Sequence, residues 1–122
     1  MNYAAQMGGG IVSLRVELEA ENIDKVEKII FEELARMQES GPTDDERQLA
    51  LIKFESQHAF DTETSEGLAN AYGLAETTWA LDAEVGYVDR LRKITNAQIR
   101  DAARRYLSRE NFARIAFNPR KP

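Results

Sequence analysis

The sequence predicts an α+β fold, in which an antiparallel sheet of two or three strands, part of a larger sheet, has about five helices packed on one face. Residues 11–19 alternate apolar and polar side chains, as a half-buried strand does. Later segments repeat apolar residues at spacings of three and four, as amphipathic helices do. So few strands for so many helices indicate that the chain either associates or belongs to a larger protein.

The principal strand covers residues 11–19, and its two faces differ. One face is apolar and the other polar: Val12, Leu14, Val16 and Leu18 against Ser13, Arg15, Glu17 and Glu19. Parallel strands are usually covered on both faces and apolar throughout, so this alternation favours an antiparallel sheet with one face in water.

A β-hairpin is expected at the start of the chain. Tyr3–Gln6 has the pattern of a short strand, and the glycines at 8–10 allow a tight turn into the next strand. A phosphate-binding glycine loop is disfavoured, because such a loop needs a helix after it and a strand follows here.

The first helix is predicted to follow residue 22 and to end at Ser40-Gly41-Pro42, because glycine accepts a left-handed cap and proline cannot continue a helix. Its apolar stripe, expected to face the sheet, consists of Ile23, Val26, Ile30, Leu34 and Met37. The next four residues, Thr43-Asp44-Asp45-Glu46, have the spacing of a capping box, so a second helix is expected to begin near Asp44.

Two more helices and a break are expected in the middle of the chain. The second helix should end near Thr62, and Ser65 should cap the third. The side chains expected to face inward are Leu49, Ile52 and Phe60 on the second helix and Leu68, Tyr72, Ala75 and Trp79 on the third. Gly67 and Gly73 predict close packing or local irregularity. After a brief break at Leu81-Asp82, a short fourth helix should present Val88, Leu91 and Ile94.

The last elements are predicted from residue 95 onward. Thr95 and Gln98 have capping-box spacing and should open a helix. Its inward side chains are expected to be Ile99, Ala102, Ala103, Tyr106 and Leu107. A turn over Ser108–Asn111 should lead into a closing strand, Phe112–Phe117.

Composition and charge exclude some classes of protein. The hydrophobic content is 43% and the charged content 30%, as in a soluble globular protein of one domain. No apolar run approaches a membrane span, residues 1–10 lack a signal-sequence pattern, and there is no cysteine for disulfides or thiolate metal sites. Residues 1–89 hold 6 basic and 19 acidic side chains, whereas residues 90–122 hold 10 and 2. Without a nucleic-acid motif, this asymmetry favours mutual attraction within the fold or an assembly over nucleic-acid binding.

No residue constellation indicates a reaction. The single histidine, His58, has Glu55 and Asp61 three residues to either side, on neighbouring turns of one helix face. A metal could use these three side chains, but a catalytic zinc usually needs more than one histidine, so a solvated helix face is favoured. No arrangement of a serine triad is visible. The aromatic residues Tyr72, Trp79 and Tyr106 are interpreted as core side chains rather than cofactor contacts.

The order of these signals resembles a known family. The sequence has a glycine-led strand (GGGIVSLRVELE), a helix of the type NIDKVEKIIFEELARMQESG, the turn G-x-T-x-x-E at Gly41–Glu46, and the stretch I-T-x-x-x-I-x-x-A-A-x-x-Y-L at Ile94–Leu107. It is similar to the carboxy-terminal portion of a half-unit of the insulinase/pitrilysin-type zinc metallopeptidases, which include the mitochondrial processing peptidase and its bacterial relatives. The resemblance extends over nearly the whole chain.

The resemblance implies a supporting role rather than a catalytic one. The family binds zinc through His-x-x-Glu-His and a later glutamate, which a chain with one histidine cannot supply. Its substrate-gripping arginine and tyrosine would lie upstream of this hairpin. The chain would then be a piece of a larger peptidase, without catalytic, cofactor or metal residues of its own, that forms a wall of the chamber around an unfolded peptide. Ser13, Arg15 and Glu17 are expected to face that chamber.

The expected partners are the remainder of the peptidase chain or a partner subunit, a peptide substrate, and further copies of the chain joined through an exposed sheet edge. Neither nucleic acid nor a membrane is expected. The resemblance implies a bacterial cytoplasm or periplasm as the compartment. Two alternatives remain: a scaffold or assembly subunit of the same family without peptidase activity, and an independent helical protein-interaction module.

Overall fold

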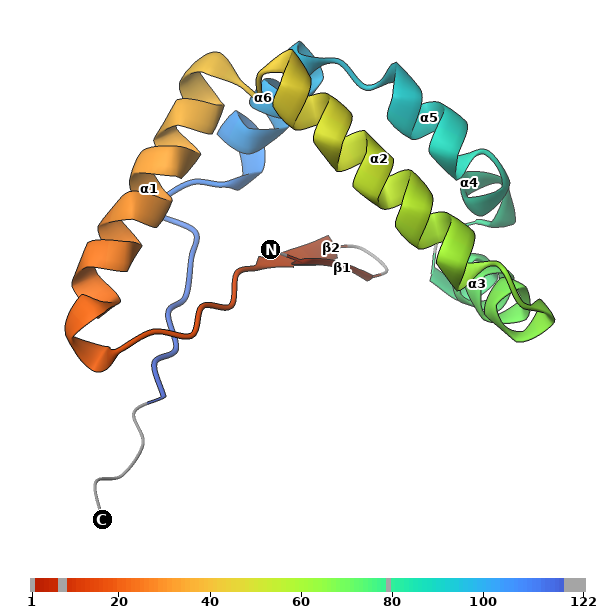
Figure 1. Ribbon diagram of the computed structural model, residues 1–122, viewed down its shortest axis with the longest axis horizontal. Helices are drawn as coiled ribbons and strands as arrows, with labels where there is room; N and C mark the ends of the chain where they lie inside the picture. Colours follow the sequence, from red (N-terminus) through yellow and green to blue (C-terminus); the bar gives the residue numbers. More distant parts are fainter. Residues whose placement is uncertain (1, 7–8, 79, 118–122) are drawn as a thin grey trace. The chain divides into compact units, whose positions relative to one another are not determined.

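The computed structural model describes residues 2–6, 9–78 and 80–117. Their contacts group into two units. The first unit comprises residues 2–15 and 44–94, and the second comprises residues 16–43 and 95–117. Figure 1 shows the helices and strands of both units in chain order. The expectation of a single domain stays a prediction.

In the second unit, helix α1 (Ile23–Ser40) packs against helix α6 (Asn96–Tyr106). A 3-10 turn, η1 (Ala20–Asn22), leads into α1, and the chain after α6 continues beside α1 without regular structure (Figure 1). The rings of Phe31 and Phe112 meet edge to face at 4.9 Å, and Arg114 pairs with Glu27. The segment after α6 therefore runs antiparallel to α1, from Gln38 toward Glu27.

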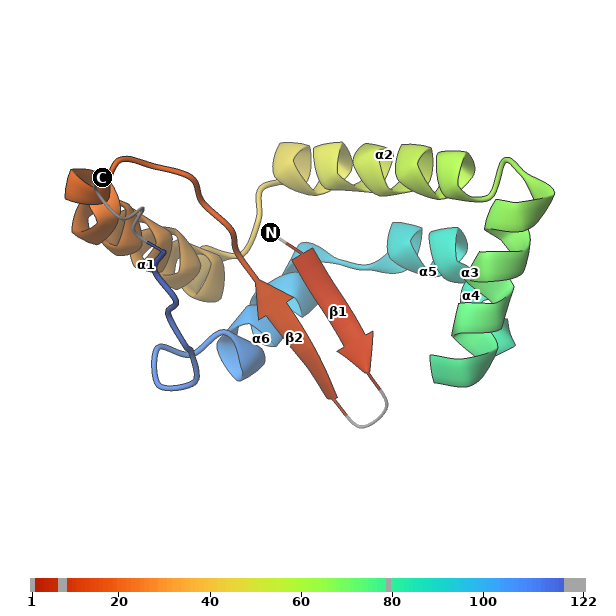
Figure 2. The same cartoon turned by 90° about the horizontal axis from the view of Figure 1, so that it is seen from below.

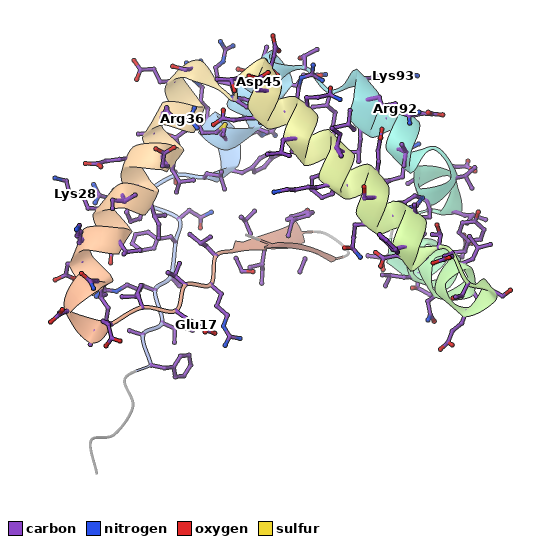
Figure 3. The ribbon with its side chains drawn as sticks, viewed as in Figure 1. Glu17, Lys28, Arg36, Asp45, Arg92 and Lys93 are labelled. Carbon is purple, nitrogen blue, oxygen red and sulfur yellow. The ribbon has the colours of Figure 1, made fainter. Side chains whose placement is uncertain are left out.

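Helix α1 agrees with the sequence pattern that predicts it. Its five stripe residues are all half-buried: Ile23, Val26, Ile30, Leu34 and Met37. Glu32, Glu33 and Glu39 are exposed, and Lys28 projects away from the segment that follows α6 (Figure 3). Within this unit α1 contacts α6, and Phe31, beside the stripe, contacts Phe112 of the following segment. The packing of α1 on a sheet stays a prediction.

Glycine and a capping box define the ends of these two helices, as predicted. Gly41 follows α1 with a positive φ of 74°, which glycine adopts without a steric penalty, although its ψ of −174° is extended rather than left-handed helical. The capping box at the start of α6 is confirmed: Thr95 accepts from the Gln98 amide, and the Gln98 side chain accepts from the Thr95 amide. Ala103, in the middle of the helix, is buried.

The first unit begins with the predicted hairpin, whose antiparallel strands β1 (Asn2–Gln6) and β2 (Gly9–Ser13) are drawn as arrows in Figure 2. The prediction of the second strand is partly wrong, because β2 ends at Ser13, opposite Asn2, and residues 14–19 pair with no strand in the described part of the chain. A Cβ at Gly10 would lie 2.5 Å from Cε2 of Tyr3, so the Tyr3 ring would have to move aside for any other residue there. The turn itself falls on residues 7–8, outside the described residues.

Four helices complete the first unit: α2 (Asp44–Asp61), α3 (Ser65–Thr78), α4 (Leu81–Val85) and α5 (Tyr87–Lys93). Helix α2 begins and ends where the sequence predicts, and its first turn is acidic; Asp45 is labelled there in Figure 3. Helix α2 contacts α5 and α3, and α3 contacts α4. The predicted break at Leu81-Asp82 is wrong, because α4 begins at Leu81.

Several inward-facing predictions are also wrong. Leu49, Ile52 and Phe60 of α2 are 50–73% exposed. Tyr106 of α6 is exposed as well, whereas Ala75 of α3 is fully buried, as predicted. Periodicity identifies the apolar side of a helix but not whether a neighbour covers it, and these side chains have too few neighbours in the described chain to be covered. Trp79, predicted on the α3 face, lies outside the described residues.

Two further local predictions need correction. The side chain of Thr64, not of Ser65, caps α3, since its hydroxyl accepts from the Gly67 amide at 3.0 Å. The turn over Ser108–Asn111 is confirmed by a backbone hydrogen bond of 3.2 Å. The closing strand after it is wrong: residues 112–117 are exposed and pair with no strand among the described residues. A strand requires a hydrogen-bonded neighbour, and an alternating pattern does not supply one.

The coarse fold class agrees with the sequence prediction. The described residues contain six α-helices and one two-stranded antiparallel sheet, a combination compatible with an α+β fold. In this described part, no helix combines the length and the apolar character needed to cross a membrane.

Candidate functional site

The three residues predicted to face a chamber lie on and just after strand β2. Ser13 is the last residue of β2, and Arg15 and Glu17 follow it on the segment that leads toward α1, where Figure 3 labels Glu17. All three are exposed. The ladder that would place them on one strand face ends at Ser13. Their role in lining a chamber stays a prediction.

The three candidate metal ligands on α2 are engaged with other partners. Nδ1 of His58 lies 3.6 Å from a carboxylate oxygen of Glu84 on α4, and Glu55 accepts a hydrogen bond of 2.7 Å from Arg92 on α5. Asp61 accepts from Gln57 at 2.7 Å. No group of three or more histidine, aspartate and glutamate side chains within the described ranges could hold a metal ion.

Tyr87, at the start of α5, lies beside the His58–Glu84 pair. Its ring centroid is 5.7 Å from that of His58. Burial, and in second place the negative charge of Glu84, raise the pKa of the Tyr87 phenol above its ordinary value of 10.0, because both disfavour the phenolate. This cluster joins α2, α4 and α5 and is best described as a contact between helices.

The second unit contains a pocket of about 220 Å³ that the sequence reasoning missed. Its lining residues come from α1 and from the chain after Tyr106: Phe31, Leu34, Ala35, Gln38, Leu107 and Arg109. The guanidinium of Arg109 lies 4.5 Å from the centroid of the Phe31 ring. Phe31 lies next to the predicted α1 stripe, but the pattern of α1 does not show that Leu107 and Arg109 lie opposite it. The lining offers packing and hydrogen bonding but no nucleophile or general base.

Beside this pocket, α1 and α6 cap each other's carboxyl ends. The Gln38 side-chain amide donates to the carbonyl of Leu107 at 2.5 Å, and Nε of Arg104 donates to the carbonyl of Gln38 at 2.5 Å. The last carbonyls of a helix lack partners within the helix, and a cation there also offsets the helix dipole. Each helix end is therefore completed by a side chain from the other helix.

The two most specific stretches of the sequence meet in the second unit. Gly41 opens the G-x-T-x-x-E turn, and residues 94–107 form the stretch that contains α6. A Cβ on Gly41 would lie 3.1 Å from Cβ of Arg100 and 3.1 Å from the carbonyl oxygen of Asn96. A side chain at residue 41 would require Arg100 or Asn96 to shift by a few tenths of an ångström, so the glycine favours this close approach.

Comparison with known proteins identifies no relative: no family model, no curated protein and no solved structure matches this chain.

Proposed function

We propose that this chain is a non-catalytic carboxy-terminal segment of a zinc-dependent metalloendopeptidase of the insulinase/pitrilysin type, and that it forms a wall of the chamber that encloses an unfolded peptide. In this proposal the zinc and its ligands belong to the remainder of the peptidase chain or to a partner subunit. The hairpin forms part of a larger sheet, and the helices pack on one face of that sheet. The compartment is a bacterial cytoplasm or periplasm.

The observation that carries the proposal is the contact between Gly41 and α6. The resemblance depends on two sequence stretches that residues 47–93 separate, and each alone is only moderately specific. The two stretches lie close together, because a Cβ added at Gly41 would be 3.1 Å from the Cβ of Arg100. A glycine that allows this close approach supports a structural role for this part of the chain.

The exposed polar residues Ser13, Arg15 and Glu17 fit the proposed wall, because a water-filled chamber that holds an extended peptide needs polar groups along its surface. The engagement of Glu55 and Asp61 with Arg92 and Gln57 fits a metal centre located elsewhere.

The experiment is to isolate the native assembly through an affinity tag on this chain. We expect a polypeptide with a His-x-x-Glu-His motif in that assembly, and hydrolysis of an unfolded peptide that a zinc chelator abolishes and added zinc restores. A photoreactive amino acid at Ser13 should cross-link to the peptide, whereas one at the exposed Glu63 should not.

The alternatives give different results in the same experiment. An assembly without the zinc motif and without chelator-sensitive hydrolysis would identify a scaffold subunit. A chain isolated alone would identify an independent interaction module. Either result would overturn the peptidase proposal.

A further inference from the structure

The pocket of the second unit combines an apolar wall with one cation. Phe31, Leu34, Ala35 and Leu107 supply apolar surface, and Arg109 adds a guanidinium. Ala35 and Arg109 are exposed and the other three are half-buried, so the pocket is open to solvent within this unit. A ligand that has both an apolar body and a charged group would therefore find a suitable partner for each part.

The volume of the pocket limits the size of that ligand. An apolar cavity of about 150 Å³ in an engineered protein holds benzene, and sites for drug-sized molecules begin at about 300 Å³. The pocket, at about 220 Å³, lies between these values. It suits one ring, or one branched aliphatic group, with a short polar extension. Burial of this apolar body against Phe31 and Leu34 would supply the hydrophobic part of the binding free energy.

Arg109 can bind an anion because its hydrogen-bond donors are not used within the described chain. Its guanidinium carbon lies 4.5 Å from the centroid of the Phe31 ring, and it forms no hydrogen bond or ion pair with another described residue. A contact with an aromatic face leaves the N–H groups at the edge of a guanidinium available. Arg114, on the same segment, is instead paired with Glu27.

The polar groups of the lining favour a carboxylate over a phosphate. A guanidinium donates two parallel hydrogen bonds to the two oxygens of a carboxylate. The Gln38 amide already donates to the carbonyls of Leu107 and Ala103, so among the described lining residues Arg109 alone offers donors to a ligand. A phosphate would leave oxygens and charge without partners beside an apolar wall, which is costly.

We propose that this pocket binds a small ionised carboxylic acid whose apolar body is one ring or a branched aliphatic group. The body packs against Phe31, Leu34 and Leu107, and the carboxylate accepts two hydrogen bonds from Arg109. The ligand is a small molecule rather than the end of a peptide, because the volume leaves little room for a main chain beside the apolar body. This proposal does not rest on the peptidase assignment.

Titration of the full chain with 3-phenylpropionate, followed by the chemical shifts of the backbone amides, tests the class of ligand. 3-Phenylpropionamide keeps the ring and lacks the charge, whereas propionate keeps the charge and lacks the ring. We expect one saturable site per chain, with a dissociation constant about tenfold or more lower for 3-phenylpropionate than for either control. An absence of saturation at millimolar concentrations, or equal affinity for the acid and its amide, would overturn the proposal.

Exchange of one arginine tests the role of the cation. Arg109→Gln should raise the dissociation constant of 3-phenylpropionate about tenfold or more and leave that of the amide nearly unchanged. The matched control is Arg105→Gln, because Arg105 also contacts a ring, that of Tyr106 at 5.3 Å, but lies outside the lining. The control should change the affinity by less than about twofold, since salt screens distant charges. Equal losses in the two variants would indicate a general attraction to the basic segment and would overturn the site.

A larger side chain in the wall tests the location. Ala35→Leu fills the pocket and should abolish the binding of both the acid and the amide, and circular dichroism verifies that the helices remain. Ala50→Leu makes the same change at an exposed position of α2 and should leave binding intact. Binding that Ala35→Leu does not weaken would overturn the location.

A peptide distinguishes a small acid from a chain end. N-acetyl-trialanyl-phenylalanine carries a phenyl ring and a carboxylate at the end of a main chain, and it should bind more weakly than 3-phenylpropionate. Equal or tighter binding of the peptide would overturn the assignment to a small molecule.

Discussion

The two units differ in how far along the sequence their side-chain interactions reach. In the second unit, Gln38 and Leu107 interact across 69 residues, and Arg114 and Glu27 across 87. In the first unit the corresponding pair, Arg92 and Glu55, is separated by 37 residues. Both units bury little: the buried residues of the described chain are all small, namely Gly41, Pro42, Ala75 and Ala103.

This difference shows which interactions hold each unit in a single fold although its core is small. The second unit depends on hydrogen bonds and one close backbone approach between α1 and α6. The first unit depends on contacts between helices that are closer in sequence and on pairs at their surfaces. Disrupting a long-range contact should therefore cost the second unit more than an equivalent change costs the first.

The largest effect is expected from Gly41→Ala. The new Cβ would have to fit at a φ of 74° and 3.1 Å from both Arg100 Cβ and the Asn96 carbonyl. Such strain should lower the free energy of unfolding by about 1–3 kcal/mol, measured by urea denaturation. The matched control is Gly73→Ala in α3, where a new Cβ would have no neighbour within 4 Å apart from the backbone of its own helix. The control should stabilise the chain by about 0.5–1 kcal/mol, and a loss of stability there would contradict the comparison.

A smaller effect is expected from Gln38→Ala. This change leaves the Leu107 carbonyl without its side-chain donor and should cost about 1 kcal/mol in thermal or urea unfolding. Combined with Arg104→Ala the losses should be non-additive, since both residues cap the same pair of helix ends. The control is Gln57→Ala in the first unit, which removes a solvent-exposed hydrogen bond to Asp61 within the same helix. Equal losses for Gln38→Ala and Gln57→Ala would remove the distinction between the two units.

The pH dependence of stability should report on Tyr87 in the first unit. Burial and the charge of Glu84 raise the pKa of this phenol in the folded state. The contribution of Tyr87 to the free energy of unfolding is therefore fully present below pH 10.0 and is lost as the pH rises through the folded-state pKa. Tyr87→Phe should weaken the fall in stability above pH 10, as measured by urea unfolding at a series of pH values. Tyr106→Phe, at an exposed ring, is the control. An identical pH profile for wild type and Tyr87→Phe would be the contrary result.

The smallest effect is expected from Arg92→Ala. Arg92 and Glu55 form a hydrogen-bonded pair of 2.7 Å, but the arginine side chain is 56% exposed. Exposed ion pairs contribute little and are screened by salt. The melting temperature should fall slightly at low ionic strength and should equal that of the wild type in 1 M salt. A large fall in the melting temperature that persists in 1 M salt would mean that the first unit depends on the Arg92–Glu55 pair.

Local signals in the sequence determined the helix boundaries well. Gly41 and Pro42 end α1, and Thr95 and Gln98 open α6, because these residues act on backbone groups only a few positions away. The hairpin at residues 2–13 was predictable for the same reason, from its glycines and the alternation that follows them.

What only the tertiary structure decided is which of these elements have partners. The alternation at residues 14–19 and 112–117 predicts strands, yet neither stretch pairs with a strand in the described chain, since a ladder depends on a neighbour that no local pattern specifies. The inward-facing assignment of Phe60 failed because burial requires a covering element. The cap between Gln38 and the Leu107 carbonyl joins residues that are 69 positions apart. The pocket beside Phe31 likewise brings α1 together with Leu107 and Arg109. Sequence periodicity carries no information about such distant contacts.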